Sequence, residues 1–339
     1  MSPADTRIRT LSEAADWLEG LFNVERRPDW PYRRFSLAAI RALLDRLGAP
    51  ESSLSVLHVA GSKGKGSTAL LAEALLRAGG LSTGTFTSPH LESFSERFRI
   101  DGVDVEGARF ADAVDRVRPH VEALRADDPE HAPTFFDATT ATALLLFQEA
   151  RVDHVMLEVG LGGRLDSTNA CRPRVTCVTS IELEHTDRLG DTLAAIAAEK
   201  AGILKPGVPV VVGNLPDEAL RVVCDRAAEV GASTAMLGRD FTLTVDRAKS
   251  GQPPDGVRLR VVDGPLDAEF ELPLLGPAAP QNAALAIACV RRLVEAAPGD
   301  VARWAREGLP AARLPGRVEV LTREPCVIVD AAHTVASAQ

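Results

Sequence analysis

Several features that mark other classes of protein are scarce in this chain. Aromatic residues make up only 4% of its 339 residues. No run of apolar residues approaches the roughly 18 to 20 that a membrane-spanning helix needs. The N-terminal segment MSPADTRIRT lacks the apolar core of a secretory signal peptide. The lack of a long apolar run and of a signal core argues against a membrane or secreted protein, and we expect a cytoplasmic one.

Cysteine and positive charge are also in short supply. The five cysteines form no C-x-x-C pair, which favours buried free thiols and argues against a cysteine-built metal site. The formal charge of −9 and the pI near 5.4 argue against nucleic acid or a membrane surface as partner. With 45% hydrophobic and 25% charged residues, the composition is that of a core-forming protein of one large or two domains.

The most informative stretch that is present is LSVLHVAGSKGKGST, residues 54–68. Its apolar start, Leu54–Val59, predicts a buried strand, and Thr68–Ala78 predicts a helix. Glycines between them let backbone N–H groups turn toward one anion, where the helix N-terminus adds partial positive charge. Lys65 adds a full charge, and Ser67 offers a hydroxyl to a magnesium ion. The predicted phosphate loop comprises Gly61, Ser62, Lys63, Gly64, Lys65, Gly66, Ser67 and Thr68.

The spacing of this loop departs from the usual G-x-x-x-x-G-K-[ST], because two residues separate Gly61 from Gly64 and Gly66 separates Lys65 from Ser67. A glycine-rich turn on a solvated loop is therefore an alternative from the loop alone.

From residue 54 to about residue 214, strand-like and helix-like patterns alternate. This alternation predicts a parallel sheet wrapped by helices, with ligands beyond the carboxyl ends of its strands. The expected strands are Val56–Val59, Thr83–Thr87, His154–Val159, Val175–Ile181 and Val208–Val212. The expected helices are Thr68–Ala78, Arg109–Arg125, Thr139–Glu149, Leu193–Ala201 and Asp217–Val230.

The pattern changes after residue 240. Short alternating runs separated by turn-rich segments in Phe241–Pro273 predict a small antiparallel meander. We expect Gln281–Ala297 to form one amphipathic helix and Leu309–Gly316 to be a linker. Val327–Asp330 then predicts a further strand.

A series of motifs resembles one known family. The phosphate loop is similar to the variant used by Mur ligases, and within them the chain resembles folylpolyglutamate synthase/dihydrofolate synthase. The resemblance runs from about residue 30 to the last residue, with its motifs in the family's order. Besides the loop, the matching segments are Thr87–Leu91, Glu96–Gly102, Thr134–Asp137, Leu157–Asn169, Glu184–Thr186, Glu199–Ile203, Pro315–Arg317 and Asp330–His333.

The resemblance implies an α/β fold with a mostly parallel sheet and helices on both faces. We expect residues 1–308 to form the ATP-binding central domain, with the antiparallel section at about 241–273. Residues 309–339 would be a linker and the first strand of a Rossmann-like C-terminal domain, which needs on the order of 100 residues. We therefore expect a truncated chain, or one completed by another polypeptide, in which Val327–Asp330 has no sheet to join and exposes an unpaired edge.

The implied reaction is ATP-dependent amide ligation. The acceptor carboxylate, from a folate or dihydropteroate, takes the γ-phosphoryl group, and the amine of L-glutamate attacks the acyl phosphate. Relatives are usually monomers. Three alternatives remain: a truncated or degenerate ligase that binds nucleotide without ligation, a Mur-type ligase for a different acid and amine, and a P-loop switch protein.

We expect Ser67 of the phosphate loop to contact Mg²⁺, and the resemblance implies that Ser88, Glu158 and His185 hold it as well. Oxygen donors suit this hard cation, whereas an imidazole is a less typical ligand. From the residues alone, Glu158 could cap a sheet edge and His185 could be structural. The residue before His185 is Glu184, where the family usually has Asp.

Lys65, His185 and Lys200 are the candidate catalytic residues. By default Lys200 is a lysine at a helix C-terminus, ended by Gly202. In the family the matching lysine is carbamylated, so the resemblance implies an anion at this position.

The ATP contacts carried over from the family are Asn282, Arg317, Asp330 and His333. The match is weaker here, because the family's G-x-H-Q-x-x-N has Ala278 and Ala279 at its His and Gln positions, and D-G-A-H-N appears as DAAHT.

The acceptor site is carried over with further departures. The arginine of the family's G-L-x-R stretch is Ala39, and the usual Glu of the T-[YF]-F-E stretch is shortened to Asp. The two phenylalanines could stack on a flat pterin, or could belong to the core. The predicted acceptor-binding residues are Thr134, Phe135, Phe136, Asp137, Leu165, Asp166 and Ser167.

Overall fold

The computed structural model describes residues 7–23, 35–246, 256–274, 276–323 and 325–331. Its centre is an eight-stranded sheet with the order β4-β3-β2-β5-β1-β6-β7-β8. Six neighbouring strands of this sheet run parallel to one another, in the order β2, β5, β1, β6, β7 and β8. Strands β3 and β4 extend the sheet beyond β2 in antiparallel fashion. The mostly parallel α/β fold is thus confirmed. The strands are β1 Val56–Ala60, β2 Thr83–Phe86, β3 Phe98–Ile100, β4 Val103–Asp104, β5 His154–Glu158, β6 Val175–Val178, β7 Val210–Val212 and β8 Thr234–Met236.

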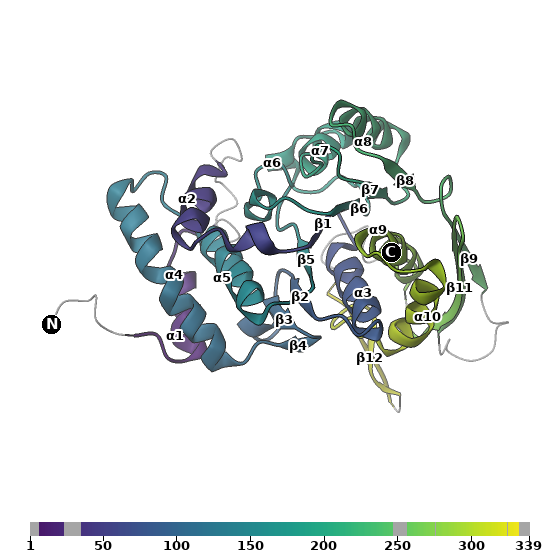
Figure 1. Ribbon diagram of the computed structural model, residues 1–339, viewed down its shortest axis with the longest axis horizontal. Helices are drawn as coiled ribbons and strands as arrows, with labels where there is room; N and C mark the ends of the chain where they lie inside the picture. Colours follow the sequence, from purple (N-terminus) through teal and green to yellow (C-terminus); the bar gives the residue numbers. More distant parts are fainter. Residues whose placement is uncertain (1–6, 24–34, 247–255, 275, 324, 332–339) are drawn as a thin grey trace.

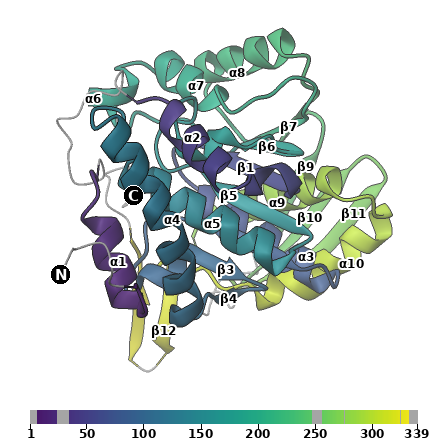
Figure 2. The same cartoon turned by 60° about the vertical axis from the view of Figure 1, so that its left-hand side comes forward.

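Helices cover both faces of this sheet, as Figures 1 and 2 show. Alternate strand residues supply two cores: Val211 of β7 packs toward one face, and Val210 and Val212 pack toward the other. One face carries α3 Lys65–Ala78, α9 Ala279–Leu293 and α10 Pro298–Gly308. The opposite face carries α1 Leu11–Glu19, α2 Ala38–Arg46, α4 Gly107–Asp127, α5 Phe135–Ala150, α7 Leu193–Ala201 and α8 Asp217–Glu229.

The expected antiparallel meander is confirmed. It consists of β9 Thr242–Asp246, β10 Val257–Asp263 and β11 Leu266–Leu272, with β10 in the middle. Leu266, Ala268, Phe270 and Leu272 alternate with exposed residues along β11 and enter the core shared with α9 and α10. This small sheet therefore packs against α10 and against α9, whose Asn282 lies at the phosphate loop.

The helix expected over Gln281–Ala297 is present as α9 Ala279–Leu293, which begins two residues earlier and ends four residues earlier than predicted. Helix α9 ends at Leu293, Val294 is extended, and a separate helix α10 begins at Pro298. A proline disfavours helical backbone at the residue before it, and Ala297 is accordingly extended with ψ 145°. Pro298 instead fits the first turn of the new helix, where its missing N–H costs no bond.

The strand expected near residue 327 does have a partner. β13 Cys326–Val329 pairs in antiparallel fashion with β12 Glu319–Arg323, so the expectation that it joins no sheet is wrong. This ribbon exposes apolar side chains, among them Leu321 and Ile328. Leu309–Gly316, predicted as a linker, begins with the short 3-10 helix η7 Leu309–Ala311. The domain boundary near residue 308 stays a prediction.

The cysteines and helix lengths complete the comparison with the sequence. Cys171, Cys177 and Cys289 are buried free thiols as expected, but Cys224 is half-buried and Cys326 is exposed. Helix α3 begins at Lys65, three residues earlier than predicted. None of the helices within the described ranges has the length and apolar character needed to traverse a lipid bilayer.

Candidate functional site

The loop between β1 and α3 has the form that its glycines predict. Gly64 is the N-cap of α3 and has a left-handed backbone with φ 80°, which favours glycine. Since Gly64 has no side chain, the N–H groups of the first helical turn are not capped by it. A Cβ at this position would come within 2.4 Å of Asn282 Oδ1, which places Asn282 of α9 directly against the loop. The helix N-terminus is thus open toward a cavity and suited to an anion.

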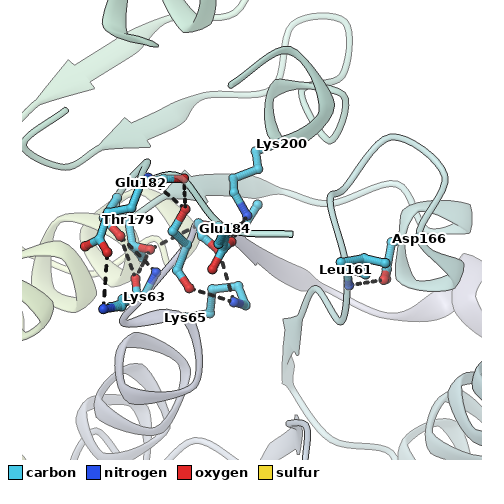
Figure 3. Close-up of polar contacts among 12 residues, drawn as sticks. Lys63, Lys65, Leu161, Asp166, Thr179, Glu182, Glu184 and Lys200 are labelled. Carbon is cyan, nitrogen blue, oxygen red and sulfur yellow. Dashed lines mark hydrogen bonds and ion pairs between the residues drawn. The ribbon is translucent and has the colours of Figure 1, made fainter. Parts of the chain in front are cut away.

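The first half of the loop is tied to the end of β6. The N–H of Ser62 donates to the carbonyl of Ser180 at 2.8 Å, and the N–H of Lys63 donates to Ser180 Oγ at 2.9 Å. The carbonyl of Lys63 accepts from Thr179 Oγ1 at 2.5 Å. Figure 3 shows these contacts around Thr179 and Lys63. The N–H groups left for an anion are therefore those that follow Lys63.

Two ammonium groups meet at this loop. Lys65 Nζ donates to the carbonyl of Gly61 at 3.0 Å and to that of Ser62 at 3.3 Å. Lys200 Nζ donates to the same Gly61 carbonyl at 3.0 Å and pairs with Glu184 Oε1 at 2.7 Å. Burial, with a contribution from Lys65, lowers the pKa of Lys200 to about 8. Lys200 is thus the buried support of the loop, and Lys65 is its ammonium on the cavity side.

Glu158 is the buried carboxylate of the site. It ends β5, is 5% exposed, and accepts hydrogen bonds from the backbone N–H groups of Ser88, at 3.0 Å, and Gly66. Burial raises its pKa, while Lys65 opposes that shift. Gly66 is required here, because a Cβ on it would lie 2.9 Å from Glu158 Oε2. A buried carboxylate of this kind is stabilised by a neighbouring cation.

The donor set around Glu158 fits Mg²⁺. The Ser67 and Ser88 hydroxyls and the Glu158 carboxylate belong to the lining of one cavity, and oxygen donors suit a hard divalent cation. The described residues contain no cluster of three or more His, Cys, Asp or Glu side chains for a metal. Any cation here would therefore depend on the hydroxyl groups as well as on Glu158.

His185 approaches the cavity from the segment after β6. It precedes the short helix α6 Thr186–Leu189 and has a left-handed backbone with φ 47°. Burial lowers the pKa of His185; Glu184 opposes this shift, whereas Lys200 and Lys65 add to it. A neutral imidazole keeps a lone pair available to a metal ion.

Most of the predicted site residues line one cavity of about 2100 Å³. From the loop it includes Ser62 through Ser67. Gly61, Thr68 and Lys200 lie behind this surface, and His333 lies outside the described residues. The other predicted residues in the cavity lining are Ser88, Thr134, Phe136, Asp137, Glu158, Leu165, Asp166, Ser167, His185, Asn282, Arg317 and Asp330.

The two neighbouring phenylalanines have different surroundings. Phe135 is 1% exposed and packs edge-on against Phe94, with the guanidinium of Arg97 over its ring. It belongs to the core and not to the cavity lining, contrary to the prediction. Phe136 lines the cavity, and a Cβ on Gly160 would lie 2.6 Å from its ring. Of the pair, Phe136 is therefore the one whose ring a bound molecule could reach.

The two aspartates of the predicted acceptor site are held by internal hydrogen bonds. Asp137 completes a capping box at the start of α5. Its Oδ2 accepts from the N–H of Thr134 at 2.8 Å, and its Oδ1 accepts from Ser167 Oγ at 2.7 Å. Asp166 Oδ2 accepts from the N–H groups of Gly160 and Leu161, and its Oδ1 accepts from Thr168. Both aspartates thus shape the wall of the cavity, and burial raises the pKa of Asp166 to about 6.

Glu182 and Gln281 are among the cavity-lining residues that the sequence did not predict as site residues. Glu182 pairs with Lys63, with 3.2 Å between Oε2 and Nζ. Gln281 donates through Nε2 to the carbonyl of Thr179 at 3.3 Å. The sequence did carry a signal for Glu182, because it directly follows the predicted strand Val175–Ile181 and lies two residues before Glu184. Residues at the carboxyl ends of parallel strands are expected to lie near the ligand.

Comparison with known proteins agrees with this geometry. A model of the Mur ligase middle domain matches residues 59–290. This chain belongs to the Mur ligase family. The matched region of this Mur ligase contains the phosphate loop, Glu158, His185 and Lys200, and ends within α9.

Individual relatives indicate which group of Mur ligases this chain is similar to. The Mur ligase is 36% identical over 325 residues to the dihydrofolate synthase/folylpolyglutamate synthase of Bacillus subtilis, covering 95% of this chain and 73% of that protein. It is 37% identical to the protein of the same name from Escherichia coli, covering 98% and 72%. It spans 35% of a longer bifunctional relative from Halobacterium salinarum. The resemblance to folylpolyglutamate/dihydrofolate synthases is thus confirmed.

Solved structures give the same result. An FPGS–AMPPCP complex matches with a TM-score of 0.86 at 31% identity, covering 97% of this chain and 78% of that one. An FPGS–AMPPCP–folate complex matches with a TM-score of 0.85 at 33% identity, with the same coverage. The Mur ligase therefore shares the fold of folylpolyglutamate synthases.

Proposed function

We propose that this chain is an ATP-dependent ligase that adds L-glutamate to a folate, to dihydropteroate, or to both. One observation carries the proposal: the phosphate loop and the wall formed by Thr134, Phe136, Asp137 and Leu165–Ser167 open into the same cavity. A ligase of this type must bring a nucleotide and an acid together. The names of the relatives, which include both synthase activities, support the same reading.

We assign the binding of ATP to the part of the cavity that contains the phosphate loop. The first-turn N–H groups of α3 other than that of Gly66, which donates to Glu158, would bind the phosphates together with the ammonium of Lys65, in keeping with helix N-termini as anion sites. Lys65 can leave the Gly61 and Ser62 carbonyls for a phosphate, because Lys200 continues to donate to Gly61. Asn282, Arg317 and Asp330, all in the cavity lining, are the proposed further contacts to ATP, with His333 as a prediction from the sequence.

We propose that Ser67, Ser88, Glu158 and His185 hold Mg²⁺. When bound, this ion neutralises phosphate charge and favours phosphoryl transfer. Glu158 supplies the negative charge that retains a cation, and its hydrogen bonds to Ser88 and Gly66 fix the direction of its carboxylate. Lys65 places a second positive charge beside the same phosphates.

The reaction proceeds in two steps that balance. A carboxylate oxygen of the acceptor attacks the γ-phosphorus, the bond to the bridging oxygen of ADP breaks, and an acyl phosphate forms. The amine of glutamate then attacks the acyl carbon, inorganic phosphate leaves with one oxygen from the original carboxylate, and the amine loses a proton. The residues of the site contribute by orientation and charge, without a covalent intermediate on the protein.

Phe136 is the proposed aromatic surface for a flat pterin ring, since its ring lies in the cavity wall. Thr134, Asp137, Asp166 and Ser167 would hold that wall in shape, next to Leu165. The carbamylation of Lys200 that the resemblance implies stays a prediction; it would exchange the ammonium that pairs with Glu184 for an anion, so the roles given to Lys200 here are those of the unmodified lysine. A monomeric state and a cytoplasmic location stay predictions from the sequence.

The test is ADP release by the 339-residue chain, followed with ATP, Mg²⁺, glutamate and either dihydropteroate or a reduced folate. We expect ADP release to require both glutamate and one of the acids. Lys65→Met should abolish it without changing the folded content by circular dichroism. ADP release that ignores glutamate and both acids would contradict the proposal.

A further inference from the structure

A buried histidine lies in the strand that leads to the phosphate loop. His58 is the third residue of β1 and is fully buried. Its neighbours Leu57 and Val59 pack on the face of the sheet that carries α3, so the His58 side chain points toward the opposite face. Parallel strands covered on both faces are usually apolar throughout, and a buried polar side chain costs stability unless it is hydrogen-bonded. The role of this imidazole therefore lies in the bonds that it makes.

His58 begins a chain of hydrogen bonds that ends in the cavity wall. Its Nε2 lies 2.8 Å from Thr168 Oγ1, and the Thr168 hydroxyl donates to Asp166 Oδ1. Asp166 Oδ2 in turn accepts from the N–H groups of Gly160, at 3.0 Å, and Leu161, at 2.9 Å; Figure 3 shows the bond to Leu161. His58 and Thr168 are fully buried behind the wall, whereas the last three residues of the chain line the cavity.

The protons of this chain have one consistent arrangement. An ionised Asp166 can only accept, so the single proton of the Thr168 hydroxyl is donated to it. Thr168 Oγ1 must therefore accept from His58, which places the imidazole proton on Nε2. The other ring nitrogen, Nδ1, has no hydrogen-bond partner among the described residues, so a proton there would be an unpaired buried donor. Burial, with a contribution from Lys205, lowers the pKa of His58 to about 3, which keeps the imidazole neutral.

The turn that Asp166 holds carries part of the proposed acceptor site. Gly160 lies against Phe136, since a Cβ on Gly160 would come within 2.6 Å of the Phe136 ring. A threonine side chain can adopt more than one rotamer, and the bond from His58 selects the rotamer of Thr168 whose hydroxyl reaches Asp166. The imidazole thus fixes the direction of the carboxylate that holds the turn.

We propose that His58 is a positioning residue for the acid acceptor. Through Thr168 it fixes the Asp166 carboxylate, and through that carboxylate it holds the Gly160–Leu161 turn against Phe136. This inference rests on the proposed function, because the acceptor is the ligand assigned to this wall. It gives β1 two roles: its end opens into the phosphate loop, and its buried face supports the acceptor side of the cavity.

The first experiment is steady-state kinetics of glutamate-dependent ADP release, with the acceptor and ATP varied in turn. We expect His58→Leu to raise KM for the acceptor about three- to tenfold and to leave KM for ATP within about twofold. Thr168→Val should have at least the same effect, and the double variant should be no worse than Thr168→Val alone, because both act through one bond. His58→Gln should recover most of the loss, since its amide nitrogen can take the place of Nε2.

His154→Leu is the matched control. His154 Nδ1 lies 3.0 Å from Ser55 Oγ, so this variant also removes a bond between a histidine and a hydroxyl. The bond lies at the start of β5, the opposite end of that strand from Glu158, and both KM values should stay unchanged. An unchanged acceptor KM in folded His58→Leu, an additive double variant, or a rise confined to KM for ATP would overturn the inference. The last result would show that His58 acts on the phosphate loop instead.

A second experiment does not depend on turnover and uses the ligand-free chain at about pH 7.5, where most of Asp166 is ionised. NMR of ¹⁵N-labelled histidine should show His58 with its proton on Nε2. Amide hydrogen exchange at Gly160 and Leu161 should be faster in His58→Leu than in the wild type, and unchanged in His154→Leu. A proton on Nδ1, or equal exchange, would overturn the inference. If these signals are as expected but the wild type shows no acceptor-dependent ADP release, the proposed function fails and the hydrogen-bond chain stands.

Discussion

Lys65 and Lys200 both place their Nζ atoms 3.0 Å from the carbonyl oxygen of Gly61. Two ammonium groups on one acceptor repel each other, and Lys65 contributes to the lowered pKa of Lys200. Only Lys200 has a close carboxylate among the bonds described here, Glu184 at 2.7 Å. An arriving phosphate would therefore draw Lys65 away and leave Lys200 as the fixed support of the loop.

Lys200→Met tests this supporting role. Removing the ammonium leaves the poorly exposed Glu184 carboxylate and the Gly61 carbonyl without their donor, and we expect a loss of about 2–4 kcal/mol in the free energy of unfolding. The double variant Lys200→Met/Glu184→Gln should recover part of this loss, because no unpaired charge remains. Urea unfolding measures both. A single variant as stable as the wild type would show that the pair does not support the loop.

Gly66→Ala tests the contact between the phosphate loop and Glu158. The new Cβ would lie 2.9 Å from Glu158 Oε2 and must push this carboxylate aside. We expect binding of Mg²⁺ and AMPPCP to weaken by about tenfold or more. The free energy of unfolding should change by about 1 kcal/mol at most, because alanine favours a helix over glycine.

Gly299→Ala is the control for Gly66→Ala. Gly299 also lies in the first turn of a helix, α10, but a Cβ there meets no atom within 4 Å. It should raise stability by up to about 1 kcal/mol and leave binding unchanged. Equal effects of the two variants on binding would contradict the role given to Glu158.

Phe135→Ala and Phe136→Ala separate the core from the cavity wall. Phe135 is 1% exposed, so its truncation should cost about 3–5 kcal/mol of unfolding free energy. Phe136→Ala should cost less stability and raise KM for the acid acceptor more than KM for ATP. Thermal unfolding and steady-state kinetics with the acceptor varied distinguish the two. A larger acceptor effect for Phe135 than for Phe136 would contradict the assignment.

Asp166 predicts a pH effect on stability. Burial raises its pKa from 3.8 to about 6, so the native state binds this proton more tightly than the unfolded chain. The contribution of Asp166 to stability therefore falls as the pH rises through this interval. The Asp166→Asn variant cannot titrate at this position and serves as the reference. The free energy of unfolding of the wild type, relative to that of this variant, should fall by about 2 kcal/mol from about pH 4 to about pH 7.

Urea unfolding of both proteins at each pH gives this difference directly. An advantage of the wild type that stays constant or grows with pH would mean that Asp166 is ionised throughout. Since its oxygens already accept from Gly160, Leu161 and Thr168, Asp166→Asn should also loosen the turn beside the cavity.

Local sequence patterns predicted much of the fold. The apolar run before Gly61 and the glycines after it specified β1 and the phosphate loop, and Glu158 was expected at the end of its strand because it closes an apolar run. The sequence pattern placed the end of α9 four residues too late, because Val294–Ala297 continues the apolar pattern although Pro298 disfavours helical backbone at the residue before it.

The relationships that the sequence could not supply join distant residues. Nothing in the sequence places Lys63 beside Glu182 or both Lys65 and Lys200 on Gly61, because these contacts depend on β1 and β6 lying side by side. The aromatic pair was ambiguous for a related reason. Which of Phe135 and Phe136 faces the core depends on how the start of α5 sits against Phe94 and Gly160.

The central claim is that an acid is activated by phosphoryl transfer in this cavity, and oxygen labelling tests it most directly. The chain is incubated with ATP, Mg²⁺, glutamate and an acceptor whose carboxylate carries ¹⁸O, and the released phosphate is analysed by mass spectrometry. An acyl phosphate predicts one labelled oxygen in each phosphate released. Unlabelled phosphate formed together with the amide product would contradict the account.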